Sequence, residues 1–179
     1  MPLFYKHLKY FFVLICSYLA ASYIEASPRL QRDGPVARDY VNKLEWMRCS
    51  VGQIWENDTC VGEVLLLSVR EALEIEERLR NLDGGGWRLP NLKELRSILT
   101  KVENRPKDIL PNVDTDTFPN TFAGSYWTSD VSFYSKQYQW SLNFLTGQRY
   151  NRFFPSQKLA VRMVRNYSAS KSNKLSISD

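Results

Sequence analysis

The sequence predicts an α+β fold in which two helices pack on small, twisted antiparallel sheets, with long loops on one side. Two helix start signals lie near the middle of the 179-residue chain. After them, apolar and polar residues alternate in short runs separated by turn formers, which is typical of strands. The chain beyond its first 26 residues is long enough for one domain with a substantial hydrophobic core.

The first helix is predicted over residues 68–82. Ser68 and Glu71 have the spacing of a capping box, in which each side chain bonds the backbone N–H of the other residue. Three glycines at 84–86 end the helix, because glycine tolerates the positive φ found at helix ends. Apolar residues recur at intervals of three and four and mark the buried stripe: Ala72, Ile75, Leu79 and Leu82.

The second helix is predicted over residues 92–99. Asn91 is a good N-cap, and Glu94 lies three residues further on, where its carboxylate can reach back to the N–H of Asn91. Trp87 and Leu89 are large apolar residues just before this helix start. We expect both of them to be buried in the core.

Strands are predicted at the start of residues 44–54 and in four later segments. Residues 103–125 contain few apolar side chains and many turn formers, so a long loop is expected there. Thr146 and Gly147 fit a hairpin turn between two of the later strands. The later strands are predicted over residues 126–129, 139–145, 148–153 and 159–164.

Residues 1–26 are expected to be a secretory signal peptide. Lys6 and Lys9 form a basic start, an apolar run follows over residues 11–21, and small residues lead to Ala26. The run is shorter than the ~20 apolar residues of a membrane span. Contact with a membrane is therefore expected only if this leader stays uncleaved, and the product is expected to be secreted or periplasmic.

The rest of the chain divides into three parts by composition. Residues 27–43 are polar and turn-rich, and we interpret them as a linker or a loosely tied arm. Residues 44–165 are expected to form the domain. Residues 166–179 are rich in Ser and Lys and are expected to be a disordered tail.

The cysteine and histidine content limits the possible chemistry. Once such a leader is removed, Cys49 and Cys60 are the cysteines that remain, and the one histidine, His7, is lost. Export leads to an oxidising compartment, so a Cys49–Cys60 disulfide is predicted, with a reactive thiol as the alternative. A mature chain without histidine excludes a Ser-His-Asp triad and a His-based zinc site.

Four groups of residues occur together in a fixed order. They are Trp46-Met47-Arg48-Cys49 with Gly52-Gln53-Ile54-Trp55 and Cys60-Val61-Gly62, then Trp87-Arg88-Leu89-Pro90, then Phe118-Pro119-Asn120-Thr121 with Tyr126-Trp127-Thr128-Ser129, and finally Ala160-Val161-Arg162-Met163-Val164-Arg165. This ordered set resembles the bacterial Lcl C-terminal domain family over residues 44–165. The resemblance implies a C-type-lectin-like fold, related to that of the formylglycine-generating enzymes. Those enzymes depend on reactive cysteines, whereas both cysteines here are placed for a bridge, so no catalytic residue and no enzyme activity are expected.

Two other kinds of site are less well supported. Asn112, Asp114 and Asp116 alternate like the start of a calcium-binding loop, but the later glycine and glutamate of an EF-hand are missing. These residues form either a weak calcium site or a polar loop with Asx turns, and no other cofactor is expected. A carboxylate pair for glycoside hydrolysis stays open, because its separation is a three-dimensional property.

Positive charge is concentrated near the C-terminal end. Residues 131–179 contain eight Lys or Arg and one Asp, and aromatic residues are interleaved with them. Such a one-sided basic segment favours anionic partners, since guanidinium groups bind sulfate or carboxylate bidentately. The alternative is that the aromatics are core and the arginines ordinary surface. The predicted ligand-binding residues are Arg149, Arg152, Lys158, Arg162, Tyr138 and Tyr150.

The predicted function combines these observations. The resemblance implies adhesion, with anionic polysaccharides such as glycosaminoglycans as the ligand class. We therefore expect a secreted or periplasmic, non-enzymatic recognition domain. The alternative is a structural or protein-interaction module of the cell envelope that has no glycan site and binds an envelope protein. Nucleic acid fits the charge pattern, but export makes it a poor partner.

Overall fold

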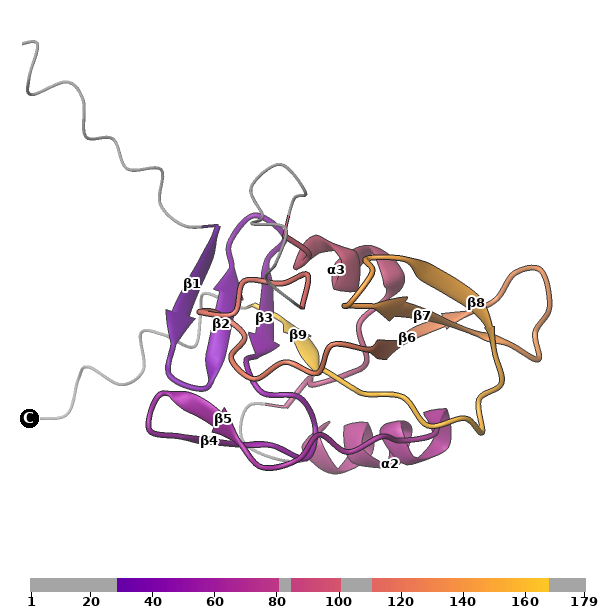
Figure 1. The fold of residues 1–179 in the computed structure, drawn as a ribbon, viewed down its shortest axis with the longest axis horizontal. Coiled ribbons are helices and arrows are strands. Elements are labelled where there is room, and N and C mark those ends of the chain that lie inside the picture. The colour runs from indigo at the N-terminus through magenta and orange to yellow at the C-terminus, as the bar shows by residue number, and fades with distance from the viewer. Residues whose placement is uncertain (1–28, 81–84, 101–110, 168–179) are drawn as a thin grey trace, which may run out of the picture.

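The computed structural model describes residues 29–80, 85–100 and 111–167 (Figure 1). The expected signal peptide and all but the first two residues of the expected tail lie outside this part of the chain. The described part is α+β, with short antiparallel sheets and two helices. Over the described residues, no helix has the length and apolar character needed to cross a membrane.

A four-stranded antiparallel sheet brings the start and the end of the domain together. Its order is β1-β2-β3-β9, and it lies at the left of Figure 1. The last strand pairs with β3, so residues 120 positions apart in sequence lie side by side, as in the pairing of Glu45 with Arg165. The strands are β1 (Leu30–Asp33), β2 (Val36–Asp39), β3 (Leu44–Met47) and β9 (Val164–Asn166).

The prediction that residues 27–43 form a linker is wrong for most of this segment. Strands β1 and β2 form a hairpin, and β2 pairs along its whole length with β3. Neither strand has the apolar alternation that identifies a strand in sequence. Their pairing is stabilised instead by the backbone ladder and by cross-strand charge pairs, since Arg38 Nε lies 2.9 Å from Oε1 of Glu45, the residue directly opposite.

A small hairpin, β4 (Ile54–Glu56) and β5 (Thr59–Val61), carries the predicted disulfide. The two turn residues, Asn57 and Asp58, both have positive φ (48° and 60°), as a two-residue hairpin turn of this hand requires. Cys60 on β5 is bonded to Cys49, with their Cα atoms 5.4 Å apart. The disulfide prediction is confirmed.

Both predicted helices form, and both begin with the predicted caps. Helix α2 (Val69–Arg80) starts after Ser68, whose backbone N–H donates to Glu71 Oε2 at 2.7 Å. Helix α3 (Leu92–Ser97) starts after Asn91, and its capping box is complete. In α2, Ala72 is buried, and Ile75 and Leu79 pack against the core, while Leu82 lies outside the described residues.

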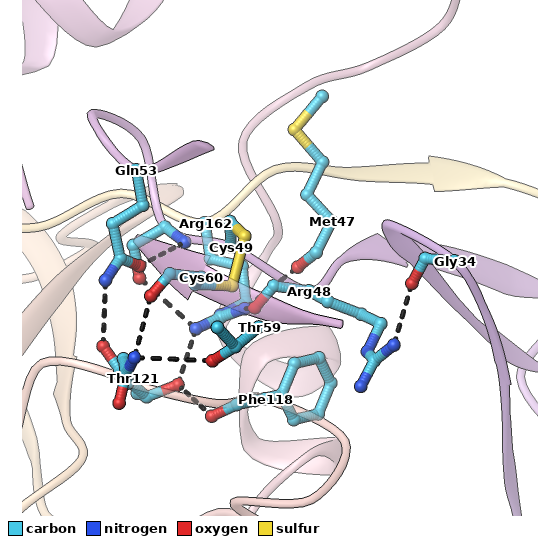
Figure 2. The surroundings of a disulfide bond; sticks show 12 residues. Gly34, Met47, Arg48, Cys49, Gln53, Thr59, Cys60, Phe118, Thr121 and Arg162 are labelled. Carbon is cyan, nitrogen blue, oxygen red and sulfur yellow. Dashed lines mark hydrogen bonds between the residues drawn. A yellow bond between two sulfur atoms is a disulfide. The ribbon is translucent and has the colours of Figure 1, made fainter. Parts of the chain in front are cut away.

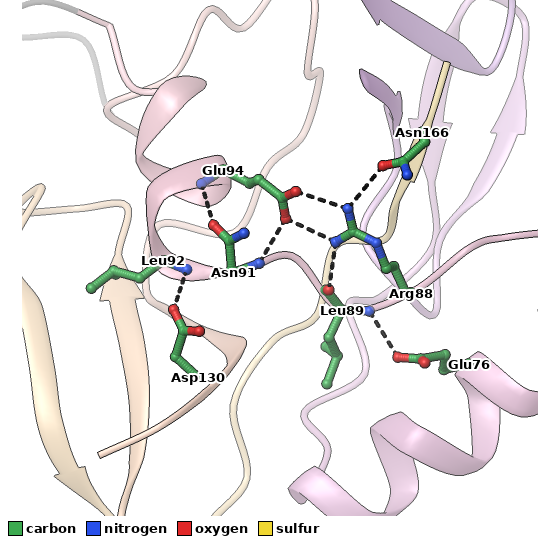
Figure 3. A network of polar contacts seen from close by, with 8 residues as sticks. All are labelled: Glu76, Arg88, Leu89, Asn91, Leu92, Glu94, Asp130 and Asn166. Carbon is green, nitrogen blue, oxygen red and sulfur yellow. Dashed lines mark hydrogen bonds and ion pairs between the residues drawn. The ribbon is translucent and has the colours of Figure 1, made fainter. Parts of the chain in front are cut away.

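Hydrogen bonds and an ion pair hold the loop before α3 in place (Figure 3). Trp87 and Leu89 are buried, as predicted. Between them, the Arg88 guanidinium makes two 2.8 Å bonds to the Glu94 carboxylate. Burial alone would raise the pKa of Glu94, but the bonds from Arg88 and from Asn91 N–H outweigh it, so its pKa lies below the usual value.

The third sheet, β6-β7-β8, lies at the right of Figure 1. It contains β6 (Ser125–Val131), β7 (Gln139–Asn143) and β8 (Arg149–Phe153), and irregular register interrupts both pairings. One face of this sheet closes the core, where the side chains of Leu142 and Phe144 are buried.

The predicted strand over residues 159–164 is not a strand for most of its length. Leu159 and Ala160 make single bridges to Leu67 and Tyr126, and regular pairing begins only at Val164. Every residue from 159 to 164 is buried, because the segment runs through the middle of the domain with structure on both sides. It therefore separates the two parts of the core, one under α3 and one under α2.

Candidate functional site

Arg162 was predicted to bind ligand, and the structure shows that this is wrong. Its side chain is fully buried beside the disulfide (Figure 2). Nη1 donates to the carbonyl oxygens of Met47 and Arg48, and Nη2 donates to Ser50 Oγ and Thr121 Oγ1. Burial lowers the pKa of Arg162, and the contact with Tyr126 opposes that effect. This guanidinium cross-links chain segments and is inaccessible to any ligand.

Two more cations of the basic C-terminal segment are engaged within the protein. Lys158 Nζ forms an ion pair with the Glu71 carboxylate at the start of α2. The hydrogen bonds from Lys158 and Ser68 lower the pKa of Glu71 to about 2. Arg165 Nε lies 2.6 Å from Glu45 Oε2. Three of the eight cations counted in residues 131–179 are therefore engaged by groups of the protein itself.

Arg149 and Arg152 remain available, as predicted. Both lie on β8 and are exposed. Neither forms an ion pair with any described carboxylate. Arg149 Cζ lies 5.6 Å from the ring centre of Trp140, so this guanidinium covers an aromatic face.

Of the two predicted tyrosines, Tyr138 lines a hollow together with Arg152, whereas Tyr150 packs edge-on against Phe153. Tyr150 on β8 is 42% exposed. Tyr138, just before β7, is half-buried, and its ring centre lies 4.8 Å from that of Phe154. Two aromatic residues that the sequence analysis did not select are far more exposed: Phe133 at 76% and Tyr134 at 74%. The sequence feature that could have indicated their exposure is that two adjacent aromatic residues follow a strand and lie between turn-forming residues.

A hollow of about 440 Å³ lies between these side chains. Its walls come from the β6–β7 loop and from β8: Ser132, Tyr134, Ser135, Tyr138, Asn151 and Arg152. The loop is held by backbone bonds, from Ser132 N to Tyr138 O at 2.8 Å and from Tyr138 N to Ser135 O at 3.0 Å. We call this region the aromatic–basic end, defined by Phe133, Tyr134, Tyr138, Arg149, Arg152 and Phe154.

The calcium candidates are engaged in other contacts. Asn112 Nδ2 donates to Leu145 O at 2.9 Å. Asp114 Oδ1 accepts from Asp116 N at 3.0 Å, which is an Asx turn. Within the described ranges, no three His, Cys, Asp or Glu side chains are grouped in a way that could hold a metal ion. The polar-loop interpretation accounts for these residues.

The comparisons with known proteins identify the family. The model of the Lcl C-terminal domain matches residues 35–165. The chain belongs to the Lcl C-terminal domain family. No curated protein matches it. The Lcl domain begins within the β1–β2 hairpin, which agrees with the finding that this segment belongs to the sheet.

Membership of the Lcl family accounts for the fold of this chain rather than for a ligand. The four residue groups that carry the resemblance contribute mainly buried side chains, among them Trp46, Trp87, Tyr126, Trp127 and Arg162. The aromatic–basic end lies between the third and fourth groups and shares no residue with them. What this Lcl domain binds must therefore be argued from its own surface.

Proposed function

We propose that this protein is an exported, non-enzymatic recognition domain that binds anionic polysaccharide through its aromatic–basic end. The observation that carries the proposal is the placement of Arg149 and Arg152, two guanidinium groups without a carboxylate partner among the described residues, beside exposed aromatic rings. We further propose that the α+β fold is C-type-lectin-like, as the family resemblance implies.

The chemistry of this surface suits a sugar polymer that carries negative charge. Guanidinium groups bind carboxylate and sulfate with two parallel hydrogen bonds. Exposed aromatic rings such as Tyr134 offer flat apolar faces to the C–H faces of sugar rings. Because Arg149 and Arg152 have no ion pair with a described carboxylate, a ligand gains their attraction without displacing such a partner.

Two observations support export and the absence of catalysis. The Cys49–Cys60 disulfide is compatible with an extracellular or periplasmic location. It also takes both of these thiols out of nucleophilic chemistry, since a bonded sulfur is no thiolate. The sequence has no histidine after His7. A binding role needs none of these groups.

The test is retention on heparin at two salt concentrations. The double variant Arg149→Ala, Arg152→Ala should bind about tenfold more weakly, which corresponds to about 1.4 kcal/mol. Retention should also fall steeply with salt, because exposed charges are screened beyond ~8 Å at physiological ionic strength.

A matched control removes the same charge elsewhere. Arg32 on β1 and Arg78 on α2 are also exposed, and replacing both by Ala changes the net charge equally. Wild-type heparin retention in the Arg149/Arg152 variant would show that the binding surface is elsewhere. An equal loss of retention in the Arg32/Arg78 control would likewise show that Arg149 and Arg152 are not the specific binding surface. Co-purification with a single envelope protein, together with no polyanion binding, would favour the envelope-interaction module.

A further inference from the structure

The hollow at the aromatic–basic end contains a single charged group. Of the side chains that line it, Arg152 is a cation, and the others are neutral hydroxyl, amide or phenol groups. Arg149 does not line the hollow and lies over Trp140 instead. A ligand seated in the hollow therefore meets one positive charge surrounded by uncharged hydrogen-bonding groups.

One of these neutral groups has no partner in the protein. Ser132 is 1% exposed, and its Oγ makes no hydrogen bond to any described atom. A buried hydroxyl without a partner is destabilising, and such groups in native proteins call for an explanation. Ser132 contributes to the wall of the hollow, but its Oγ is covered, so this side chain must rotate about χ1 before a ligand hydroxyl supplies the missing bond.

The aromatic walls add a place for a sugar ring. Tyr134 is 74% exposed, and Tyr138 is held against Phe154 by a ring contact of 4.8 Å. Backbone bonds within the β6–β7 loop hold Tyr138 close to Ser132 and Ser135, and both tyrosines line the hollow together with Arg152. The volume of about 440 Å³ falls within the range of about 300–1,000 Å³ common for ligand pockets.

We propose that this hollow takes one uronic-acid residue of a polysaccharide and that it selects the carboxylate rather than sulfate groups. This inference rests on the proposed function and narrows its ligand class. In a uronic acid the carboxylate is attached directly to a ring carbon. A carboxylate held bidentately by Arg152 therefore brings the sugar ring against the tyrosines and its hydroxyls towards Ser132, Ser135 and Asn151.

The number of charges supports carboxylate over dense sulfate. An unsulfated polymer in which uronic acid alternates with a neutral sugar, as in hyaluronan, has one negative charge per disaccharide, which matches the one cation that lines the hollow. A heavily sulfated chain has several charges per disaccharide and gains most from several cations. Its binding would depend on the wider basic surface and hardly on the neutral groups of the hollow.

The test measures binding of the full chain to three probes by calorimetry: hyaluronan oligosaccharide, the same oligosaccharide with its carboxylates reduced to alcohols, and dextran sulfate, which has no carboxylate. We expect hyaluronan to bind and the reduced form to lose at least about tenfold in affinity, the equivalent of about 1.4 kcal/mol. Arg152→Lys should give a similar loss, since an ammonium group cannot bind bidentately. Arg78→Lys is the matched control and should bind as the wild type does.

A second variant separates binding from folding. Ser132→Ala removes a hydroxyl that has no hydrogen-bond partner among the described residues, so the Tm of this variant should not fall, while its hyaluronan binding should weaken. Equal affinity for native and reduced hyaluronan would overturn the uronic-acid site, as would wild-type affinity in both the Arg152→Lys and Ser132→Ala variants. If the uronic-acid site is overturned but dextran sulfate still binds, the proposed function stands. If neither hyaluronan nor dextran sulfate binds, the proposed function itself is refuted.

Discussion

Replacing Arg162 by Met is expected to lower the free energy of unfolding by about 3–5 kcal/mol, although it removes a buried charge. The guanidinium is fully buried and lies 4.7 Å from the ring centre of Phe118. Its N–H groups donate hydrogen bonds to four oxygens, of which two are backbone carbonyl oxygens and two are hydroxyl oxygens. The methionine side chain has a similar length and offers none of these bonds.

The size of this loss of stability depends on which of the four acceptors are left without a hydrogen bond. Ser50 Oγ keeps its 2.9 Å contact with Tyr126 Oη, and Thr121 Oγ1 still donates to Phe118 O at 2.7 Å. The carbonyl oxygens of Met47 and Arg48 lose a charged donor, and a hydrogen bond to a charged group is worth about 1.5–3 kcal/mol. The variant no longer has to bury a charged guanidinium, and this gain offsets part of the free energy lost with the two hydrogen bonds.

Apolar replacement of buried charges stabilises some proteins when the partner groups are replaced as well. Here the main partners are backbone carbonyls, which no substitution removes. The lost hydrogen bonds therefore outweigh the relieved desolvation, and Arg162→Met is expected to be destabilised. Arg162→Lys should also be destabilised, because one ammonium group cannot replace two guanidinium nitrogens that donate to separate pairs of acceptors.

The assay is urea unfolding followed by tryptophan fluorescence, with stability taken from the midpoint and slope. Arg149→Met is the matched control, and as an exposed change it should alter stability by no more than about 0.5 kcal/mol. An Arg162→Met protein that loses less than about 1 kcal/mol would show that the buried network contributes little. In that case the assignment of Arg162 as a cross-link would be wrong.

Three further predictions concern other parts of the fold. Trp87→Ala should lower stability by about 3–5 kcal/mol through a cavity, seen as a fall in Tm, and an unchanged Tm would contradict its role in the core. Replacing Cys49 and Cys60 by Ser should remove about 3 kcal/mol on the chain-entropy model, and two free thiols in non-reducing mass spectrometry of exported wild-type protein would refute the bridge in the exported form. Because the folded pKa of Glu71 is about 2, against 4.5 ordinarily, its contribution is present above pH 4.5 and is lost as the pH falls towards 2. The urea midpoint should fall over that interval, and Glu71→Gln should show a weaker dependence; an identical pH profile in both proteins would contradict the assignment.

Some elements of the fold could be predicted because their causes are local. The caps at Ser68 and Asn91 each need a partner only three residues away, so the pattern in the sequence is the interaction itself. Strands β1 and β2 could not be predicted in this way. Arg38 on β2 pairs both with Asp33 on β1 and with Glu45 on β3, and the sequence of the two strands does not signal these partners.

The candidate site was predicted in part. Tyr138 and Arg152 line one hollow, and Arg149, at the other end of β8, lies over Trp140. Tyr150 packs against Phe153 instead, and Lys158 is paired with Glu71. Phe133 and Tyr134 were missed as site residues, because an aromatic residue near a strand is equally compatible with the core. Their exposure depends on the loop between β6 and β7, which holds them beyond the sheet.

The sequence by itself determined the helices with their caps, the disulfide, the family and the excess of positive charge near the C-terminal end. Only the tertiary structure decided which of those charges face solvent. Arg162 and Arg152 are both arginines within the same basic segment, yet one is fully buried and the other exposed. The physical reason is that burial depends on what packs against a residue from both sides. Residues 159–164 are covered by segments from distant parts of the chain, while β8 is at the edge of its sheet.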